Sequence, residues 1–190
     1  ATLAEQGQCL PFEPPHFGAG ATVGGMVAAG LSGPSRAAVG SVRDYVLGAT
    51  LLTGLGEVLS FGGQVMKNVA GYDVSRLLAG SMGTLGVILE VSLKVLPAAP
   101  ATATLRFAMD EAQAIVQLNE WGGQPLPLNA SAWWDGTLVV RLRGALAAVQ
   151  AAITKLGGEL IEPQHATPFW TGLRQQHDEF FTKAGAAVEA

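Results

Sequence analysis

The sequence predicts a mixed α+β fold in two parts, residues 1–97 and residues 98–190. Glycine dominates residues 12–97, interrupted by short apolar runs, and becomes sparser after them. Residues 97–100, Pro-Ala-Ala-Pro, hold two prolines that lack the N–H donor of a central strand, so they suit a boundary. From residue 103 to residue 162, strand and helix patterns follow in the order β-α-β-β-α-β, which is typical of a ferredoxin-like split βαβ unit.

The strands of the first part are indicated by apolar runs and turn residues. Residues 46–53 and 57–61 flank Gly54-Leu55-Gly56, a pattern that predicts a β-hairpin with a short glycine turn. Residues 86–96 alternate apolar and polar side chains. This period of two predicts one strand with a buried face and a wetter face.

Two short helices are expected in the first part, at residues 22–29 and 73–79. Thr22 and Asp73 stand where a helix N-cap is needed, and their side-chain oxygens can accept from the first turn. Gly80 suits the end of the second helix.

The second part contains one strong turn signal and one unpartnered helix. Asp135-Gly136 predicts a tight hairpin turn. A last helix over residues 167–182 carries apolar side chains that need a partner surface. The remaining elements are strands at 103–108, 128–134, 137–142 and 159–162, and helices at 110–120 and 145–156.

Composition excludes several classes of function. The net charge of −4, without a cluster of Lys or Arg, argues against a nucleic-acid partner. Cys9 is the single cysteine and the three histidines share no spacing, so no metal site is expected. No apolar stretch of about 18 residues and no basic leader occur, so we expect neither a transmembrane segment nor a signal peptide, and a cytoplasmic location.

The string of residues 18–34, GAGATVGGMVAAGLSGP, is a candidate phosphate cradle. It holds six glycines around the start of a short helix. Glycines let backbone N–H groups approach an anion, and a helix N-terminus favours negative charge. The spacing matches neither the dinucleotide fingerprint nor the Walker A motif. Close packing of a glycine-rich helix against a sheet is the structural alternative.

Residues 11–36, 40–63 and 65–97, which include KNVAGYD and LAGSMGTLG, resemble the FAD-binding subunits of bacterial glycolate oxidase, flavoproteins of the vanillyl-alcohol-oxidase type. The resemblance implies that residues 1–97 are the C-terminal part of an FAD-binding domain and that residues 98–190 are an incomplete substrate or cap domain. The family's first phosphate loop and its C-terminal portion have no counterpart. We therefore expect the chain to be truncated at both ends.

The resemblance also implies roles for individual residues. One group matches the segment that wraps the pyrophosphate and flavin of a non-covalent FAD, and a second group matches positions along the adenosine portion. The first group is Pro14, Pro15, Thr22, Val23, Gly24, Gly25 and Ala28, and the second is Gly40, Ser41, Val42, Gly86, Val87 and Ile88.

Lys67, Asn68, Tyr72 and Asp73 form a dense polar cluster, and Lys67 and Tyr72 are the candidate catalytic residues. A lysine can hold a substrate carboxylate or the charge of a reduced flavin, and a tyrosine can orient a hydroxyl group. The alternative is a surface loop in which Asp73 caps a helix.

The function that the resemblance implies is FAD-dependent oxidation of a 2-hydroxy acid, glycolate to glyoxylate, by a subunit of the glycolate oxidase complex. The implied partners are a larger homologous flavoprotein subunit and an iron–sulfur subunit, with peripheral attachment to the inner membrane through the complex. The alternatives are a structural or electron-relay subunit with an incomplete flavin site, and a related D-lactate or 2-hydroxy-acid dehydrogenase.

Overall fold

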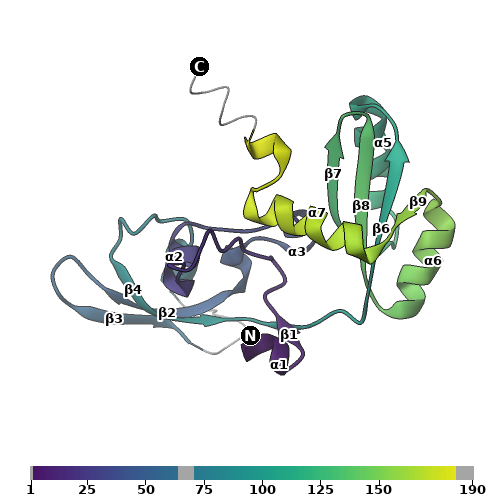
Figure 1. Cartoon of the computed structure of the whole chain (residues 1–190). Helices are drawn as coiled ribbons and strands as arrows, with labels where there is room; N and C mark the ends of the chain where they lie inside the picture. The colour runs from purple at the N-terminus through teal and green to yellow at the C-terminus, as the bar shows by residue number, and fades with distance from the viewer. Residues whose placement is uncertain (1, 64–70, 183–190) are drawn as a thin grey trace, which may run out of the picture. The chain divides into compact units, whose positions relative to one another are not determined.

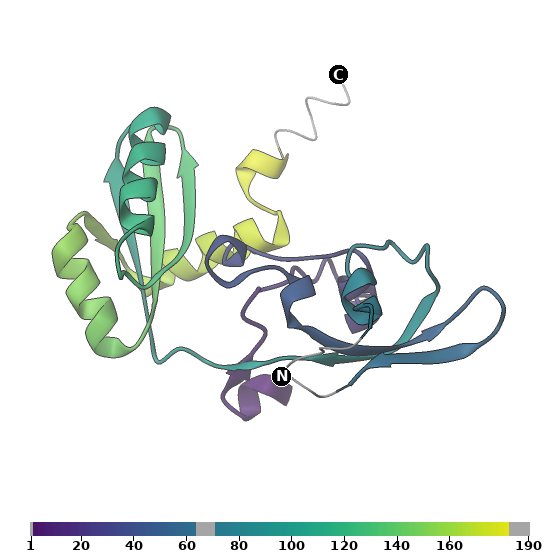
Figure 2. The same ribbon diagram turned by 180° about the vertical axis from the view of Figure 1, so that it is seen from behind.

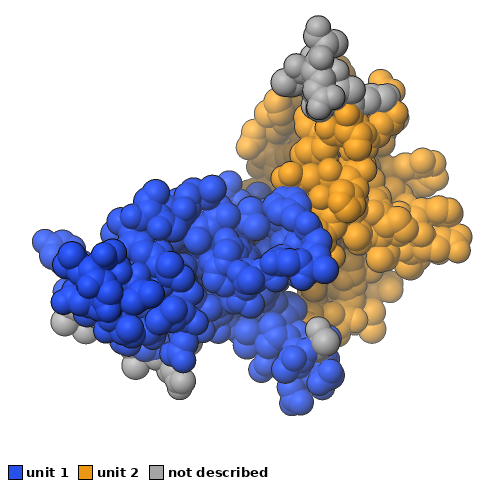
Figure 3. All heavy atoms as spheres, turned by 60° about the vertical axis from the view of Figure 1, so that its left-hand side comes forward, with its two compact units in different colours: residues 1–97 blue, residues 98–190 orange. Residues whose placement is uncertain are grey.

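The computed structural model describes residues 2–63 and 71–182. The chain divides into two compact units, residues 1–97 and residues 98–190, which Figure 3 colours blue and orange. Each unit has its own sheets and its own core. No described helix has the length and hydropathy to cross a membrane.

The first unit is built on a three-stranded antiparallel sheet with the order β3-β2-β4 (Figure 1). Its elements are α1 (Thr2–Glu5), β1 (Gln8–Cys9), α2 (Val23–Ala28), α3 (Arg36–Val39), the 3-10 helix η1 (Val42–Tyr45), β2 (Val46–Leu52), β3 (Val58–Gly62), α4 (Val74–Leu77), β4 (Val87–Leu93) and β5 (Leu96–Pro97).

The predicted hairpin is confirmed, because β2 and β3 pair in register from Gly48↔Gly62 to Leu52↔Val58. Gly56 in its turn has φ 78°, a left-handed conformation that favours glycine. The two predicted caps are confirmed as well. Thr22 Oγ1 accepts from Gly25 N at 3.0 Å, and Asp73 Oδ1 accepts from Arg76 N at 3.1 Å.

The predicted strand over residues 86–96 is wrong in two respects. It divides into β4, which pairs with β2, and β5, which pairs with β1 in a separate two-stranded sheet. A β-bulge also interrupts β4, because Thr50 pairs with Glu90 and Leu51 with Ile88, which leaves Leu89 unpaired. The extra residue shifts the side-chain period, so the predicted alternation of a buried and a wetter face fails.

Helix α2 and the chain beside it cover one face of this sheet with a core of large apolar side chains. Phe12 and Val27 are completely buried, and Phe12 packs against Tyr45 with ring centroids 5.2 Å apart. Burial raises the pKa of the Tyr45 hydroxyl above its ordinary value, with the charge of Asp44 as a second cause. The hydroxyl is therefore a stable donor, and it bonds to the carbonyl oxygen of Val39 at 2.7 Å.

The second unit has the predicted order β-α-β-β-α-β, followed by one more helix. Its four antiparallel strands lie in the order β7-β8-β6-β9, as a split βαβ unit requires. The elements are β6 (Ala101–Ala108), α5 (Glu111–Gly122), β7 (Leu128–Trp134), β8 (Thr137–Gly144), α6 (Leu146–Leu156), β9 (Glu159–Ile161) and α7 (Pro163–Gln175).

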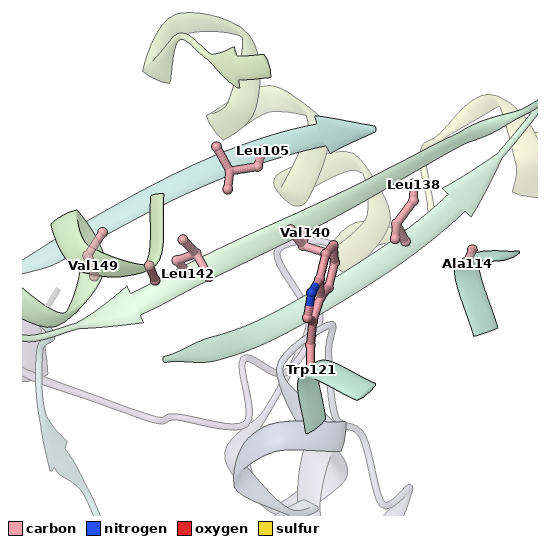
Figure 4. Packing of buried hydrophobic residues seen from close by; sticks show 8 residues of the cluster. Leu105, Ala114, Trp121, Leu138, Val140, Leu142 and Val149 are labelled. Carbon is pink, nitrogen blue, oxygen red and sulfur yellow. The ribbon is translucent and has the colours of Figure 1, made fainter. Parts of the chain in front are cut away.

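Helices α5 and α6 cover one face of this second sheet, and α7 lies on the opposite face (Figures 1 and 2). Figure 4 shows the first interface, where sheet residues such as Leu138, Val140 and Leu142 meet Trp121 of α5 and Val149 of α6. These sheet side chains alternate along β8, so Val139 and Arg141 point to the face that α7 covers.

Helix α7 is fixed to the sheet by Trp170, which is 5% exposed. Its indole Nε1 donates to Thr104 Oγ1 at 3.0 Å, and its ring lies under the guanidinium of Arg141 at 4.8 Å. Arg141 Nε in turn donates to Asn129 Oδ1 at 2.7 Å. The apolar face of the last helix therefore finds its partner within the second unit.

The predicted bounds of the last helix, residues 167–182, are wrong. The helix begins at Pro163, because a proline in the first turn needs no N–H partner. It ends at Gln175, because Gln176 adopts a left-handed conformation with φ 56°.

Arg106 and Glu159 form a bidentate pair across β6 and β9, with hydrogen bonds of 2.7 and 2.6 Å. The hydrogen bond from Arg106 lowers the pKa of the Glu159 carboxyl below its ordinary value. The Arg106–Glu159 pair therefore stabilises the folded state above the unfolded-state pKa of Glu159. This stabilisation is lost as pH falls through the folded-state pKa of the same carboxyl.

We expect Glu159→Gln to weaken the dependence of the thermal midpoint on pH in the acidic range. The effect should be small, because the two side chains are 52% and 64% exposed and salt screens the pair. Melting curves of the wild type and the variant across acidic pH test this. Parallel pH profiles for the two proteins would contradict it.

Candidate functional site

The glycine-rich segment forms α2 and the turn that leads into it. Thr22 is extended, and its cap fixes the first turn of the helix. At Gly25 a Cβ would lie 3.0 Å from Thr22 Oγ1, which leaves little room for any larger residue. Gly24 and Gly25 therefore leave two backbone positions without side chains in the first turn of the helix.

At Gly24, helix α2 lies directly on strand β4. A Cβ at Gly24 would approach the carbonyl oxygen of Ile88 to 3.4 Å and the Ile88 Cβ to 3.7 Å. Two of the four segments predicted to bind FAD, residues 22–28 and 86–88, therefore lie side by side. At Gly24 itself, the close packing that we considered as the structural alternative is what the structure shows.

The third predicted segment, Gly40-Ser41-Val42, is held by internal hydrogen bonds. The backbone N–H of Ser41 donates to Asp44 Oδ2 at 2.7 Å, and that of Val42 donates to Ser32 Oγ at 3.1 Å. The Val42 side chain is 1% exposed, in the core beside Val27. Both N–H groups already have acceptors, so they are not available to adenosine. Other atoms of this segment would have to make that contact.

Gly86 directly precedes β4 in a conformation with φ 142°, and a Cβ there would overlap the carbonyl oxygen of Leu52. Glycine is therefore required for packing at this position. The next side chain, Val87, is 60% exposed, whereas Ile88 packs against the core. Of Val87 and Ile88, which were both predicted to lie along the adenosine portion, only Val87 presents its side chain outward.

The segment of residues 11–15, called here the strap, is held against residues 33–35. Ser35 is completely buried and donates its hydroxyl to the carbonyl oxygen of Pro11 at 2.5 Å. Gly33 N donates to the carbonyl oxygen of Phe12 at 2.7 Å. These contacts fix the predicted residues Pro14 and Pro15, which are both buried.

A hollow of about 300 Å³ lies between the end of the strap and α2. Three predicted cofactor residues line it, namely Pro15, Thr22 and Gly25. Pro14, Val23, Gly24, Ala28 and the residues predicted along adenosine lie outside its lining. The lining residues that sequence reasoning did not assign to the cofactor are His16, Phe17, Gly20, Ala21, Met26 and Leu31.

The residues of the hollow fit one end of a dinucleotide. Small-molecule sites occupy about 300–1,000 Å³, so this hollow has room for one ring system but not for the whole of FAD. Apolar walls from Met26 and Leu31 face a polar rim at Thr22, and a Cβ at Gly20 would meet no atom within 4 Å. The sequence offered a signal for these residues, because Gly20, Ala21, Met26 and Leu31 lie within the glycine string and His16 and Phe17 directly precede it.

Of the two predicted catalytic residues, only Tyr72 lies within the described part of the chain. Tyr72 is 95% exposed, and Lys67 lies outside the described residues, as does Asn68. Asp73 caps α4 and also accepts from Ser75 Oγ at 3.0 Å, which is its expected structural role. Among residues 2–63 and 71–182, no three His, Cys, Asp or Glu side chains gather into a group that could hold a metal ion.

Comparison with known proteins adds independent information. A family described as an FAD binding domain matches residues 1–62. The glycolate oxidase subunit GlcE of Escherichia coli K12 is 50% identical over 97% of this chain and 52% of its own length. The mitochondrial D-lactate dehydrogenase (cytochrome) of Arabidopsis thaliana is 40% identical over 49% of this chain and 16% of its own length.

A solved structure of alkyldihydroxyacetonephosphate synthase covers 92% of this chain with a TM-score of 0.65. The identity of 16% means that this likeness shows the fold alone, a mixed α+β fold. The chain covers 42% of that structure and about half the length of GlcE. The likeness to GlcE spans both units, so this chain is a homologue of the glycolate oxidase subunit GlcE and carries part of an FAD-binding domain.

Proposed function

We propose that the natural protein containing this sequence is the FAD-binding subunit of a glycolate oxidase complex. Its substrate would be glycolate or another small 2-hydroxy acid, and its FAD would be held without a covalent bond. The observation that carries the proposal is the 50% identity to GlcE across 97% of the chain, because it extends through both units.

The first unit supplies one side of the FAD site in this proposal. The family match over residues 1–62 includes the strap, the hollow and α2. Thr22, Gly25 and the bare backbone at Gly20 would hold the pyrophosphate and the adjoining ring. Gly40-Ser41-Val42 and Gly86-Val87-Ile88 would lie along the adenosine portion.

The chemistry proposed for the complete protein is a two-electron oxidation. Glycolate loses two electrons and two protons when it becomes glyoxylate, and bound FAD supplies the acceptor for the electron pair. In this chain, the Lys67 ammonium group would hold the substrate carboxylate or offset charge on the reduced cofactor, and Tyr72 would orient the hydroxyl group. The second unit would serve as the substrate or cap domain.

The partners proposed are a larger homologous flavoprotein subunit and an iron–sulfur subunit that receives the electrons. We propose a cytoplasmic location, with attachment to the inner membrane through the complex. The support for these proposals is the likeness to GlcE, a glycolate oxidase subunit of Escherichia coli.

A second candidate function is a structural or electron-relay subunit whose flavin site is incomplete. The observation that favours it is the small size of the hollow, which accommodates only part of FAD. The flavin content of the complete protein distinguishes the two functions. A related D-lactate or other 2-hydroxy-acid dehydrogenase would be recognised by oxidation of that acid without a partner subunit.

We expect Gly20→Val in the natural protein to weaken FAD binding by about tenfold or more, which corresponds to about 1.4 kcal/mol. The added side chain meets no protein atom within 4 Å of its Cβ, so folding should be unchanged while the hollow loses volume. FAD titration followed by absorbance and a melting curve measure the two effects separately.

The matched control is Gly54→Val at the tip of the β2–β3 hairpin. A Cβ at Gly54 also meets nothing within 4 Å, but this position is remote in sequence from the hollow and absent from its lining. Equal affinity in Gly20→Val, Gly54→Val and the wild type would show that the hollow does not hold FAD.

A further inference from the structure

Phe17 differs from the other phenylalanines of this chain. The others either have an aromatic ring partner (Phe12, Phe107, Phe169, Phe180 and Phe181) or, like Phe61, pack into a core cluster. Within residues 2–63 and 71–182, Phe17 has no aromatic ring contact, and its side chain is 54% exposed. Because Phe17 also lines the hollow, its exposed ring is available to a ligand bound there.

The position of the Phe17 ring is set by an unusual backbone conformation. Phe17 adopts a left-handed conformation with φ 45°, which a bulky residue rarely takes, and Gly18 follows with φ 120°. Such a conformation persists only where the surrounding structure imposes it. Here the strap imposes it, because Pro14 and Pro15 are buried and the hydrogen bonds from Ser35 and Gly33 fix the preceding residues.

The hollow that Phe17 lines suits a flat aromatic ligand. Met26 and Leu31 supply apolar walls, and the backbone at Gly20 and Gly25 leaves space for close approach. An aromatic side chain in such a site gains both apolar contact and favourable offset-stacked geometry with a second ring.

We propose that Phe17 is a stacking platform for the isoalloxazine ring of FAD. The inference rests on the proposed function, and it assigns the flavin end rather than the adenine end to the hollow. The reason is that the segments expected along adenosine, residues 40–42 and 86–88, lie outside its lining. Phe17 is a binding and positioning residue in this arrangement, because its ring carries no group that can transfer a proton.

The test uses Phe17→Trp in the natural protein, with FAD fluorescence measured at equal occupancy. Tryptophan transfers an electron to excited isoalloxazine at contact distance, so a stacked indole is expected to shorten the fluorescence lifetime several-fold. Leu55→Trp is the control, because Leu55 is 87% exposed at the hairpin tip and lies outside the hollow. Its bound flavin should keep the wild-type lifetime.

A second variant measures the binding contribution. Phe17→Ala is expected to weaken FAD binding about tenfold, since it removes the ring's stacking and its apolar contact, while Phe17→Tyr should retain wild-type affinity. Folding of each variant is checked by its melting curve. The exposed position of Phe17 leaves the core unchanged.

The outcomes separate the two proposals. A wild-type protein that binds no FAD overturns the proposed function, and this inference with it. A wild-type protein that binds FAD while Phe17→Trp keeps the full lifetime, or while Phe17→Ala keeps its affinity, overturns only the role of Phe17.

Discussion

Replacing Trp170 by alanine is expected to destabilise the second unit by about 3–5 kcal/mol, the usual cost of removing a buried indole. Trp170 is 5% exposed, and it fills the interface between α7 and the sheet. Its loss also removes the hydrogen-bond donor to Thr104 and the ring that faces the Arg141 guanidinium. A buried cation then loses a neighbour that stabilises it.

Denaturant unfolding, combined with hydrogen exchange of the β8 amides, measures this loss in the second unit alone. The matched control is Trp134→Ala, since Trp134 is 45% exposed and its removal should have a much smaller effect. A loss of less than about 1 kcal/mol in Trp170→Ala would show that α7 does not depend on this side chain for its attachment.

Replacing Gly33 by alanine is expected to destabilise the first unit by about 1–3 kcal/mol and to reduce FAD affinity together with stability. The added Cβ would overlap the carbonyl oxygen of Glu13, which is backbone and has no rotamer to change. The strap must therefore move, and the hydrogen bond from Gly33 N to Phe12 weakens with it. Because the strap borders the hollow, its displacement also disturbs the proposed site.

Hydrogen exchange of the strap amides and FAD titration detect the two consequences. Gly54→Ala is the control, because a Cβ there meets no atom within 4 Å. If Gly33→Ala kept both the stability and the affinity of the wild type, the strap would not be the element that shapes the hollow.

Local features of the fold were predictable because each has a residue-level cause. Thr22 and Asp73 cap helices, since their oxygens reach N–H groups within the first turn. Asp135 and Gly136 have φ values of 45° and 75°, and this pair of residues favours such a turn. The order of elements in the second unit followed from its alternating helix and strand periods.

Features that depend on contacts distant in sequence were not predictable in the same way. The bulge at Leu89 depends on how β4 pairs with β2, which no local period reveals. The strap depends on Ser35 reaching Pro11, and neither residue stood out in the sequence. The start of α7 was missed, although Pro163 at the first helical position is a helix N-terminal signal.

The candidate site was predicted in outline from the glycine string, but its shape required the fold. Pro15, Thr22 and Gly25 were expected and line the hollow, whereas Phe17 and His16 emerged only when the strap had been placed. The conformation of Phe17 is a tertiary constraint, so propensity gave no reason to single it out.

The flavin content of the natural protein tests directly whether it is an FAD-binding subunit. The purified protein is measured by visible absorbance, and the supernatant is measured again after denaturation to release any non-covalent cofactor. We expect about one FAD per chain, recovered in the supernatant. A colourless protein that takes up no added FAD would contradict it, and would leave the chain as a structural subunit built on an FAD-binding fold.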